Sequence, residues 1–272
     1  RDNVWVSLCG LAKNSIKFVP EITKIFYESN LLNEAEEATP IKLGVQTWSE
    51  TTLKYNDRSN IKTEQLEYLL NYYKAHNIPY HSELILGLPG ETPDSWLDTI
   101  HKDFRFGTGL QIYHALESVP NMPLLLKHKE EYQLEQHTIY TKRDYVTDSH
   151  NKKYHRNTNF RWEDFDTSKR TDLIHKDFIK SCFSFTTDEL MKMYDYSWWM
   201  QTFYNSGLLS DIKDPRKEIL SFYDNLDSMP FWKERVETHR ELWREGMYGG
   251  KVTHIGAVRY WFYSVLRLDE LM

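Results

Sequence analysis

The sequence has 272 residues, a formal net charge of −6, and a 40% share of hydrophobic residues. This composition is typical of a folded globular protein and excludes an intrinsically disordered one. The acidic balance argues against a broad nucleic-acid-binding surface, and no apolar run reaches the roughly 20 residues of a transmembrane helix. Because Cys9 and Cys182 are the two cysteines, a disulfide framework is excluded and we expect a cytoplasmic protein.

The amino-terminal half alternates between short apolar runs and amphipathic segments. Strands are expected where β-branched and other apolar residues cluster, over residues 4–9, 41–46, 78–88 and 110–116. Helices are expected where apolar side chains recur at three- and four-residue steps, over residues 16–26 and 63–74. Residues 30–40 are acidic and irregular and are expected to form a connection. Repeated strand–helix units favour a parallel sheet, either doubly wound or part of a β/α barrel.

The turn after the third expected strand carries the most informative motif. Residues 83–92 read ELILGLPGET, an apolar strand followed at once by a Gly/Pro turn. Thr92, Pro93 and Asp94 then supply an N-cap, a first-turn proline and a first-turn acid for a helix. In α/β folds ligands bind at the carboxyl ends of the strands, and glycines there allow close approach to the backbone. We therefore expect a ligand site near this turn.

The second half of the chain has a different texture. Residues 127–172 are polar and rich in tyrosine without a sustained period, so we expect a long ordered loop there. From Thr186 onward the sequence is helical, and its many aromatic residues are expected to form core. We divide the chain into residues 1–126, a partial barrel, residues 127–185, a loop-rich connector, and residues 186–272, a helical carboxy-terminal region.

Several motifs of the first 126 residues, in this order, resemble the radical S-adenosylmethionine (radical SAM) superfamily. They are LGVQ at 43–46, NDR at 56–58, AHNI at 75–78, ELILGLPGET at 83–92, and IYHAL at 112–116 with the proline-bearing turn at 119–124. The resemblance implies an α/β fold with strands 3 to 6 of a β/α barrel, and a mainly helical region after it. It also implies an enzyme that cleaves S-adenosylmethionine reductively to a 5′-deoxyadenosyl radical.

The resemblance assigns roles to particular side chains. It places Gln46 and Arg58 at the polar end of S-adenosylmethionine, where the planar guanidinium of an arginine suits a carboxylate. It places Glu83 where a carboxylate accepts hydrogen bonds from ribose hydroxyls. Ile85 falls where an apolar side chain contacts adenine, and His114 or Ala115 completes that pocket.

The sequence departs from the superfamily pattern at the iron–sulfur cluster. The superfamily holds a [4Fe-4S] cluster on a Cys-x3-Cys-x2-Cys loop, whereas Cys9 and Cys182 stand far apart in this sequence. We therefore expect the cluster on an amino-terminal segment or a partner subunit outside this chain. Many relatives also carry an upstream cobalamin-binding domain, which makes cobalamin a further candidate cofactor by analogy. No metal-ligand spacing is found in the chain itself.

Two other functions fit the sequence. A non-catalytic binding or scaffold module could have inherited the barrel strands, in which case the chain alone is a stable monomer with a complete core. A hydrolase on a β/α barrel would use two carboxylates such as Glu83 and Glu91, which must then face one cleft. No nucleic-acid or membrane partner is expected, and the substrate stays open.

Overall fold

A computed structural model describes residues 18–29, 33–34, 37–38, 41–142, 173–205, 207, 209 and 211–244. At its centre lie three parallel strands in the order β3-β4-β5, which span Ile41–Gln46, Tyr80–Leu86 and Leu110–Ala115. Helices α2 (Glu50–Tyr55) and α3 (Thr63–Ala75) connect β3 to β4, and α4 (Pro93–Phe106) connects β4 to β5. The predicted parallel α/β arrangement is confirmed for these strands. Closure into a barrel stays a prediction.

One helix and two short strands precede the central sheet in the described part of the chain. Helix α1 spans Val19–Glu28, close to its predicted range, and packs beside α3. The predicted connection at 30–40 contains two short antiparallel strands, β1 (Asn33–Glu34) and β2 (Glu37–Ala38). The strand predicted at 4–9 lies outside the described residues.

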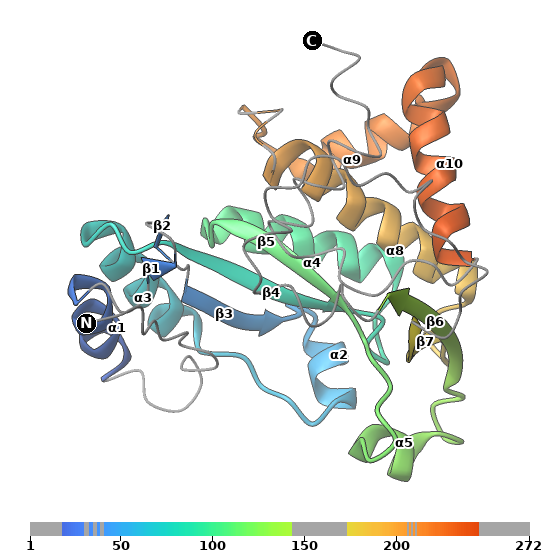
Figure 1. Cartoon of the computed structure of the whole chain (residues 1–272), viewed down its shortest axis with the longest axis horizontal. Helices are drawn as coiled ribbons and strands as arrows, with labels where there is room; N and C mark the ends of the chain where they lie inside the picture. Colours follow the sequence, from blue (N-terminus) through green and yellow to red (C-terminus); the bar gives the residue numbers. More distant parts are fainter. Residues whose placement is uncertain are drawn as a thin grey trace.

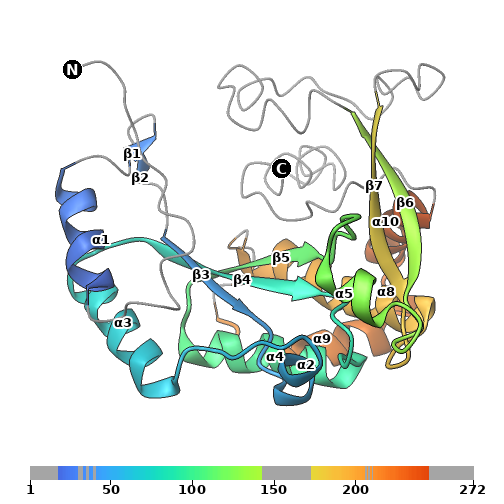
Figure 2. The ribbon, with the colours of Figure 1, turned by 90° about the horizontal axis from the view of Figure 1, so that it is seen from below.

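The sheet has one face covered by helices. Side chains of β3 alternate between buried and half-buried, and Ile41, Leu43 and Val45 are buried. In β4, Ser82 bonds to Asp103 of α4, so the even-numbered residues of that strand point toward α4. Figure 2 shows α4 and α9 (Pro215–Asp224) on that side of the sheet. The odd-numbered residues of β4 therefore point to the opposite face. We call it the open face because, among the described elements, α4 and α9 lie on the other side of the sheet.

An antiparallel ribbon continues from the end of β5. Helix α5 (Pro123–His128) leads into β6 (Glu135–Lys142), which pairs antiparallel with β7 (Leu173–Ser181). The Ser118 N–H donates to Asp177 at 2.7 Å and the Ile179 N–H donates to Leu116 at 3.2 Å, so β7 also pairs with the chain beyond β5. The prediction of a loop at residues 127–172 was therefore wrong for β6 and for the last two residues of α5, while residues 143–172 lie outside the described part.

The carboxy-terminal helices pack on α4 and supply much of the core. They are α8 (Thr187–Trp199), a π-helix η4 (Met200–Asn205), α9, a 3-10 turn η5 (Leu226–Ser228) and α10 (Pro230–Arg244). Figure 1 shows α8, α9 and α10 gathered on one side of the sheet. This confirms the predicted helical region as far as Arg244. Among these and the other described helices, none is long and apolar enough to span a membrane.

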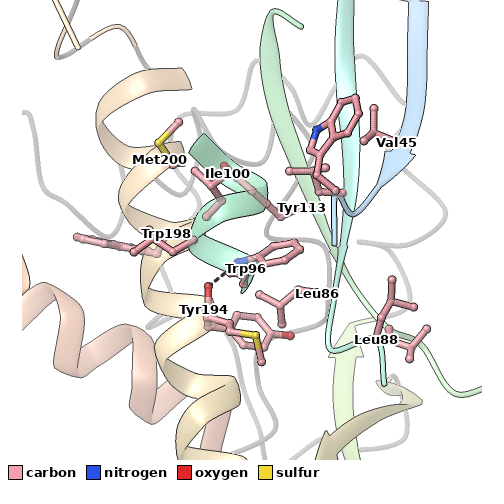
Figure 3. Packing of buried hydrophobic residues seen from close by; sticks show 14 of the residues in the cluster. Val45, Leu86, Leu88, Trp96, Ile100, Tyr113, Tyr194, Trp198 and Met200 are labelled. Atoms are coloured by element: carbon pink, nitrogen blue, oxygen red, sulfur yellow. Dashed lines mark hydrogen bonds between the residues drawn. The ribbon is translucent and has the colours of Figure 1, made fainter. Parts of the chain in front are cut away.

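Trp96 lies at the centre of the core and joins the sheet to the helical region. It is fully buried, its ring packs edge-on to Tyr113 of β5, and its Nε1 donates to the Ser197 hydroxyl of α8 at 3.0 Å. Figure 3 shows it above Leu86 and Tyr194. A buried indole N–H needs such a partner. The predicted aromatic core is confirmed for Trp198 and Trp199, which are also almost completely buried. Trp261 and Phe262 lie outside the described residues.

Candidate functional site

The open face of the sheet carries a cluster of charged side chains around Glu83. Glu83 Oε1 lies 3.4 Å from Lys42 Nζ of β3, 3.6 Å from His114 Nε2 of β5, and 3.8 Å from His81 Nε2 of β4. Each of the three central strands therefore contributes one nitrogen-bearing side chain to the same carboxylate. We call Lys42, His81, Glu83 and His114 the Glu83 cluster.

The cluster keeps Glu83 ionised. Burial alone would raise the pKa of Glu83, but the nearby imidazoles of His114 and His81 and the charge of Lys42 outweigh it and hold the pKa far below its usual range. The side chain is still 24% exposed, so a ligand can reach the carboxylate. An anion held in this way is a strong acceptor for hydroxyl and amide donors.

Gly44 leaves free space beside this cluster. It lies two residues after Lys42 on the half-buried face of β3, and an added Cβ would meet no heavy atom of the described residues within 4 Å. A larger residue here would stand on the same face as Lys42. The absence of a side chain therefore gives a ligand room on the open face.

Ile85 and His114 lie on the same face as Glu83. Ile85 follows Glu83 by two residues in β4 and is paired in register with His114 of β5. Ala115 is paired with Leu86 and alternates to the other side of the sheet. Of the two residues named for the end of the adenine pocket, His114 is the one that lies beside Glu83 and Ile85.

Gln46 occupies an unusual position at the end of β3. Its backbone is in the left-handed region, with φ at 71°, and the register between β3 and β4 shifts just before it. Its Oε1 atom is buried and has no hydrogen-bond partner among the described residues. Both features cost free energy, and such costs are concentrated at functional sites.

Arg58 stands apart from the Glu83 cluster. It follows α2, where its backbone N–H donates to Leu53 at 2.9 Å, and its side chain is exposed. Partial burial lowers the pKa of its guanidinium slightly from the usual value. Among the described residues it forms no ion pair, so its guanidinium is available to an anionic ligand group.

The glycines of the turn after β4 serve packing. Gly90 has φ at 93°, and a Cβ there would come within 2.7 Å of the Tyr55 ring of α2. The Gly90 N–H donates to Ser184 at 2.8 Å, and Asn56 Nδ2 donates to the Pro89 carbonyl at 2.9 Å. The close approach expected of a ligand at Gly90 is taken by Tyr55 of the protein itself.

Glu91 does not share a cleft with Glu83. It is completely buried, and its carboxylate accepts hydrogen bonds from Thr47 at 2.8 Å and from Ser95. Burial raises the pKa of Glu91 to about 7, although hydrogen bonds from Ser95, Thr47 and Thr52 oppose this rise. A carboxyl group closed off in this way is structural, which removes the support for a hydrolase built on these two residues.

No metal centre or cluster site is visible in the part of the chain that the structure describes. No group of three histidine, cysteine or acidic side chains there is arranged to hold a metal ion. Cys182 is a free thiol whose sulfur lies 3.2 Å from the Ser184 hydroxyl, and Cys9 falls outside the described residues. The residues present do not fit a [4Fe-4S] cluster.

A shallow polar cavity lies on the other side of the sheet. It has a volume of about 250 Å³ and lies between the turn after β3 and α4. Its lining consists of Trp48, Ser49, Ser95, Asp98, Thr99 and Lys102. Because α4 covers the face opposite Glu83, this cavity is separate from the Glu83 cluster.

Sequence reasoning named Glu83, Ile85 and His114, which the structure brings onto one face, and did not name Lys42 and His81. His81 lies two residues before Glu83 in the same strand, so strand alternation places both on one face. Lys42 is paired with His81 in the register of β3 and β4. The spacing of His81 and Glu83 was readable in the sequence, whereas the position of Lys42 required the strand register.

Two curated proteins are similar to this chain over somewhat less than half of its length. One is the cobalamin-dependent radical SAM methyltransferase TokK of Streptomyces tokunonensis, 35% identical over 128 residues, which are 46% of this chain and 18% of the relative. The other is a 2-(S-pantetheinyl)-carbapenam-3-carboxylate methyltransferase of Streptantibioticus cattleyicolor, 34% identical over 116 residues, 42% of this chain and 16% of the relative. The matched segment thus spans less than a fifth of either relative. No family model matches the chain.

Proposed function

We propose that this chain is part of a radical SAM enzyme and binds S-adenosylmethionine on the open face of its parallel sheet. The observation that carries the proposal is the ionised carboxylate of Glu83, which is partly exposed beside the space left by Gly44. The similarity to a radical SAM methyltransferase supports the same assignment. The bound cofactor would supply a 5′-deoxyadenosyl radical after reductive cleavage.

Each proposed contact follows from the chemistry of the side chain. Glu83 accepts hydrogen bonds from the ribose hydroxyls, because an ionised carboxylate offers acceptors alone. Ile85 packs against the adenine ring next to His114. The orphaned Gln46 Oε1 accepts from the methionine ammonium, and Arg58 pairs with the methionine carboxylate.

The cluster thiolates come from outside this chain in the proposed enzyme. Two separated cysteines cannot hold four irons, so a cluster-bearing segment or subunit must complete the site. Cobalamin belongs to the proposal in the same way, because the name of one relative includes it. The proposed reaction type is methyl transfer.

The lack of a cysteine set for the cluster favours a second function, a binding or scaffold module without catalysis. A chain that supplies no cluster ligands has no means of reducing S-adenosylmethionine by itself. The two functions differ in their ligand, since a scaffold has no reason to bind an adenosyl group. Binding is therefore the property to measure first.

Calorimetric titration of the whole chain with S-adenosylhomocysteine tests the proposal. We expect saturable binding by the unchanged protein and about tenfold weaker binding by Glu83→Gln, because a hydrogen bond to a charged group is worth roughly 1.5–3 kcal/mol. Glu67→Gln, an exposed position on α3, is the matched control and should bind normally.

Absence of binding at millimolar ligand, or equal binding by the unchanged protein and Glu83→Gln, would overturn the proposal. The catalytic half has its own readout. The natural protein, reconstituted anaerobically with iron and sulfide, should release 5′-deoxyadenosine from S-adenosylmethionine. Binding without such release in the reconstituted protein would favour the non-catalytic module.

A further inference from the structure

The contacts of Glu83 are concentrated on one of its two oxygens. Lys42 Nζ, His81 Nε2 and His114 Nε2 all lie within 3.8 Å of Oε1. Among the described residues, none forms a hydrogen bond with Oε2. A carboxylate has two oxygens with about four lone-pair positions, so half of its accepting capacity is left over.

We propose that Lys42, His81 and His114 are positioning residues that hold Glu83 by Oε1 and leave Oε2 to accept two hydrogen bonds from the free 2′,3′-diol of a ribose. This inference rests on the proposed function and adds the residues that make the acceptor work. It also predicts a specificity, because the negative charge of Glu83 repels a second anion next to Oε2. A ribose that carries a 2′- or 3′-phosphate should be rejected.

The position of the three residues supports this role over that of a surface ion pair. His81 is only 4% exposed, and its two ring nitrogens have no hydrogen-bond partner among the described residues. Its Nε2 atom lies 3.8 Å from Glu83 Oε1. A buried polar ring without full hydrogen bonding costs free energy. A role of the His81 ring in orienting the Glu83 carboxylate would explain why this cost in free energy is tolerated.

Electrostatics give the positioning residues a measurable effect. Burial by itself raises the pKa of Glu83, and the nearby imidazoles of His114 and His81 together with the charge of Lys42 reverse this. The groups that face Glu83 are Lys42 from β3, His81 from β4 and His114 from β5. If two of them are removed, the effect of burial dominates and the carboxyl group takes up a proton in mildly acidic solution.

The test is the pH dependence of adenosine binding by the full chain, measured by calorimetry between pH 5 and pH 8. Adenosine does not titrate in this range, so a change reports on the protein. The unchanged protein should bind within twofold at both ends. The double variant Lys42→Met with His114→Gln should bind about tenfold more weakly at pH 5 than at pH 8, since one pKa unit corresponds to a factor of ten.

Controls separate positioning from folding. Lys42→Arg combined with His114→Gln keeps the cation and should restore the flat pH profile of adenosine binding. Lys54→Met removes an exposed lysine of α2 and should leave adenosine binding unchanged. Far-ultraviolet circular dichroism and the unfolding midpoint report whether each variant is folded. Adenosine 3′-phosphate, used with the unchanged protein, should bind at least tenfold more weakly than adenosine.

The outcomes for this inference and for the proposed function are distinct. If the unchanged protein binds adenosine, Glu83→Gln does not, and the folded double variant keeps a flat pH profile, the positioning role is wrong while the proposed function stands. Equal affinity for adenosine and its 3′-phosphate would overturn the specificity. If the unchanged protein binds no adenosine, both proposals fail.

Discussion

At the residue scale, the site combines side chains that the sequence revealed with side chains that required the structure. The shared face of Glu83 and Ile85 was predictable, because strand alternation makes it readable from their spacing. Lys42 was not, because its contact with Glu83 depends on the register between β3 and β4. The interpretation of Gly90 failed for a similar reason, since the ring that fills its space belongs to Tyr55.

Glu91 gives a residue-scale prediction about stability. Its pKa is raised to about 7 in the folded chain, so the folded state retains a proton that the unfolded state loses near the ordinary value of 4.5. Stability from this group is therefore complete below about pH 4.5 and is lost as the pH rises toward 7. The loss amounts to roughly 3 kcal/mol at 1.36 kcal/mol per pKa unit.

Urea denaturation of the unchanged protein and Glu91→Gln at pH 4.5 and pH 8 measures this effect. The unchanged protein should lose more free energy of unfolding between these pH values than the variant, by about 3 kcal/mol. Glu67→Gln should behave as the unchanged protein does. Equal pH dependence in the unchanged protein and Glu91→Gln would show that Glu91 ionises normally.

At the element scale, helix ends were predicted well and strand partners were not. Thr92 forms the predicted N-cap of α4, in a capping box with Ser95, because cap signals are local in sequence. The β6–β7 ribbon was missed because its strands are polar and lie more than 30 residues apart, so no turn motif links them. The pairing is nonlocal, and strand propensity alone does not reveal it.

Two glycines give an element-scale prediction with opposite outcomes. Gly90→Ala should destabilise the chain by about 2 kcal/mol or more, because φ is positive and the new Cβ would overlap the Tyr55 ring. Gly44→Ala should change stability by less than about 0.5 kcal/mol, because its Cβ enters free space. Thermal unfolding of both variants checks this, and a similar loss in both would contradict the packing of the turn on α2.

At the scale of the whole molecule, the parallel strands and the helical carboxy-terminal region followed from the sequence. The sheet is joined to those helices by buried contacts, such as Trp96 Nε1 to Ser197, and by the ribbon that extends from β5. These contacts join residues about 60 to 100 positions apart, which no local pattern predicts. How far the strands continue toward a barrel stays a prediction.

The attachment of α10 gives a prediction at this scale. Arg240 of α10 pairs with Asp195 of α8, with Nε at 3.1 Å from Oδ2, and the Asp195 side chain is only 3% exposed. Arg240→Ala should destabilise the chain by about 3 kcal/mol, because it removes the cation from a buried carboxylate. Hydrogen exchange should become faster along α10 first. Unchanged exchange in α10 would show that other contacts hold the helix.

The most direct test of the central claim is a crystal structure of this chain with S-adenosylhomocysteine. The account predicts ribose hydroxyl oxygens about 2.7 Å from Glu83 Oε2, with adenine against Ile85 and the three nitrogen-bearing side chains still grouped around Oε1. A ligand bound elsewhere, or an open face occupied by other parts of the protein, would contradict it.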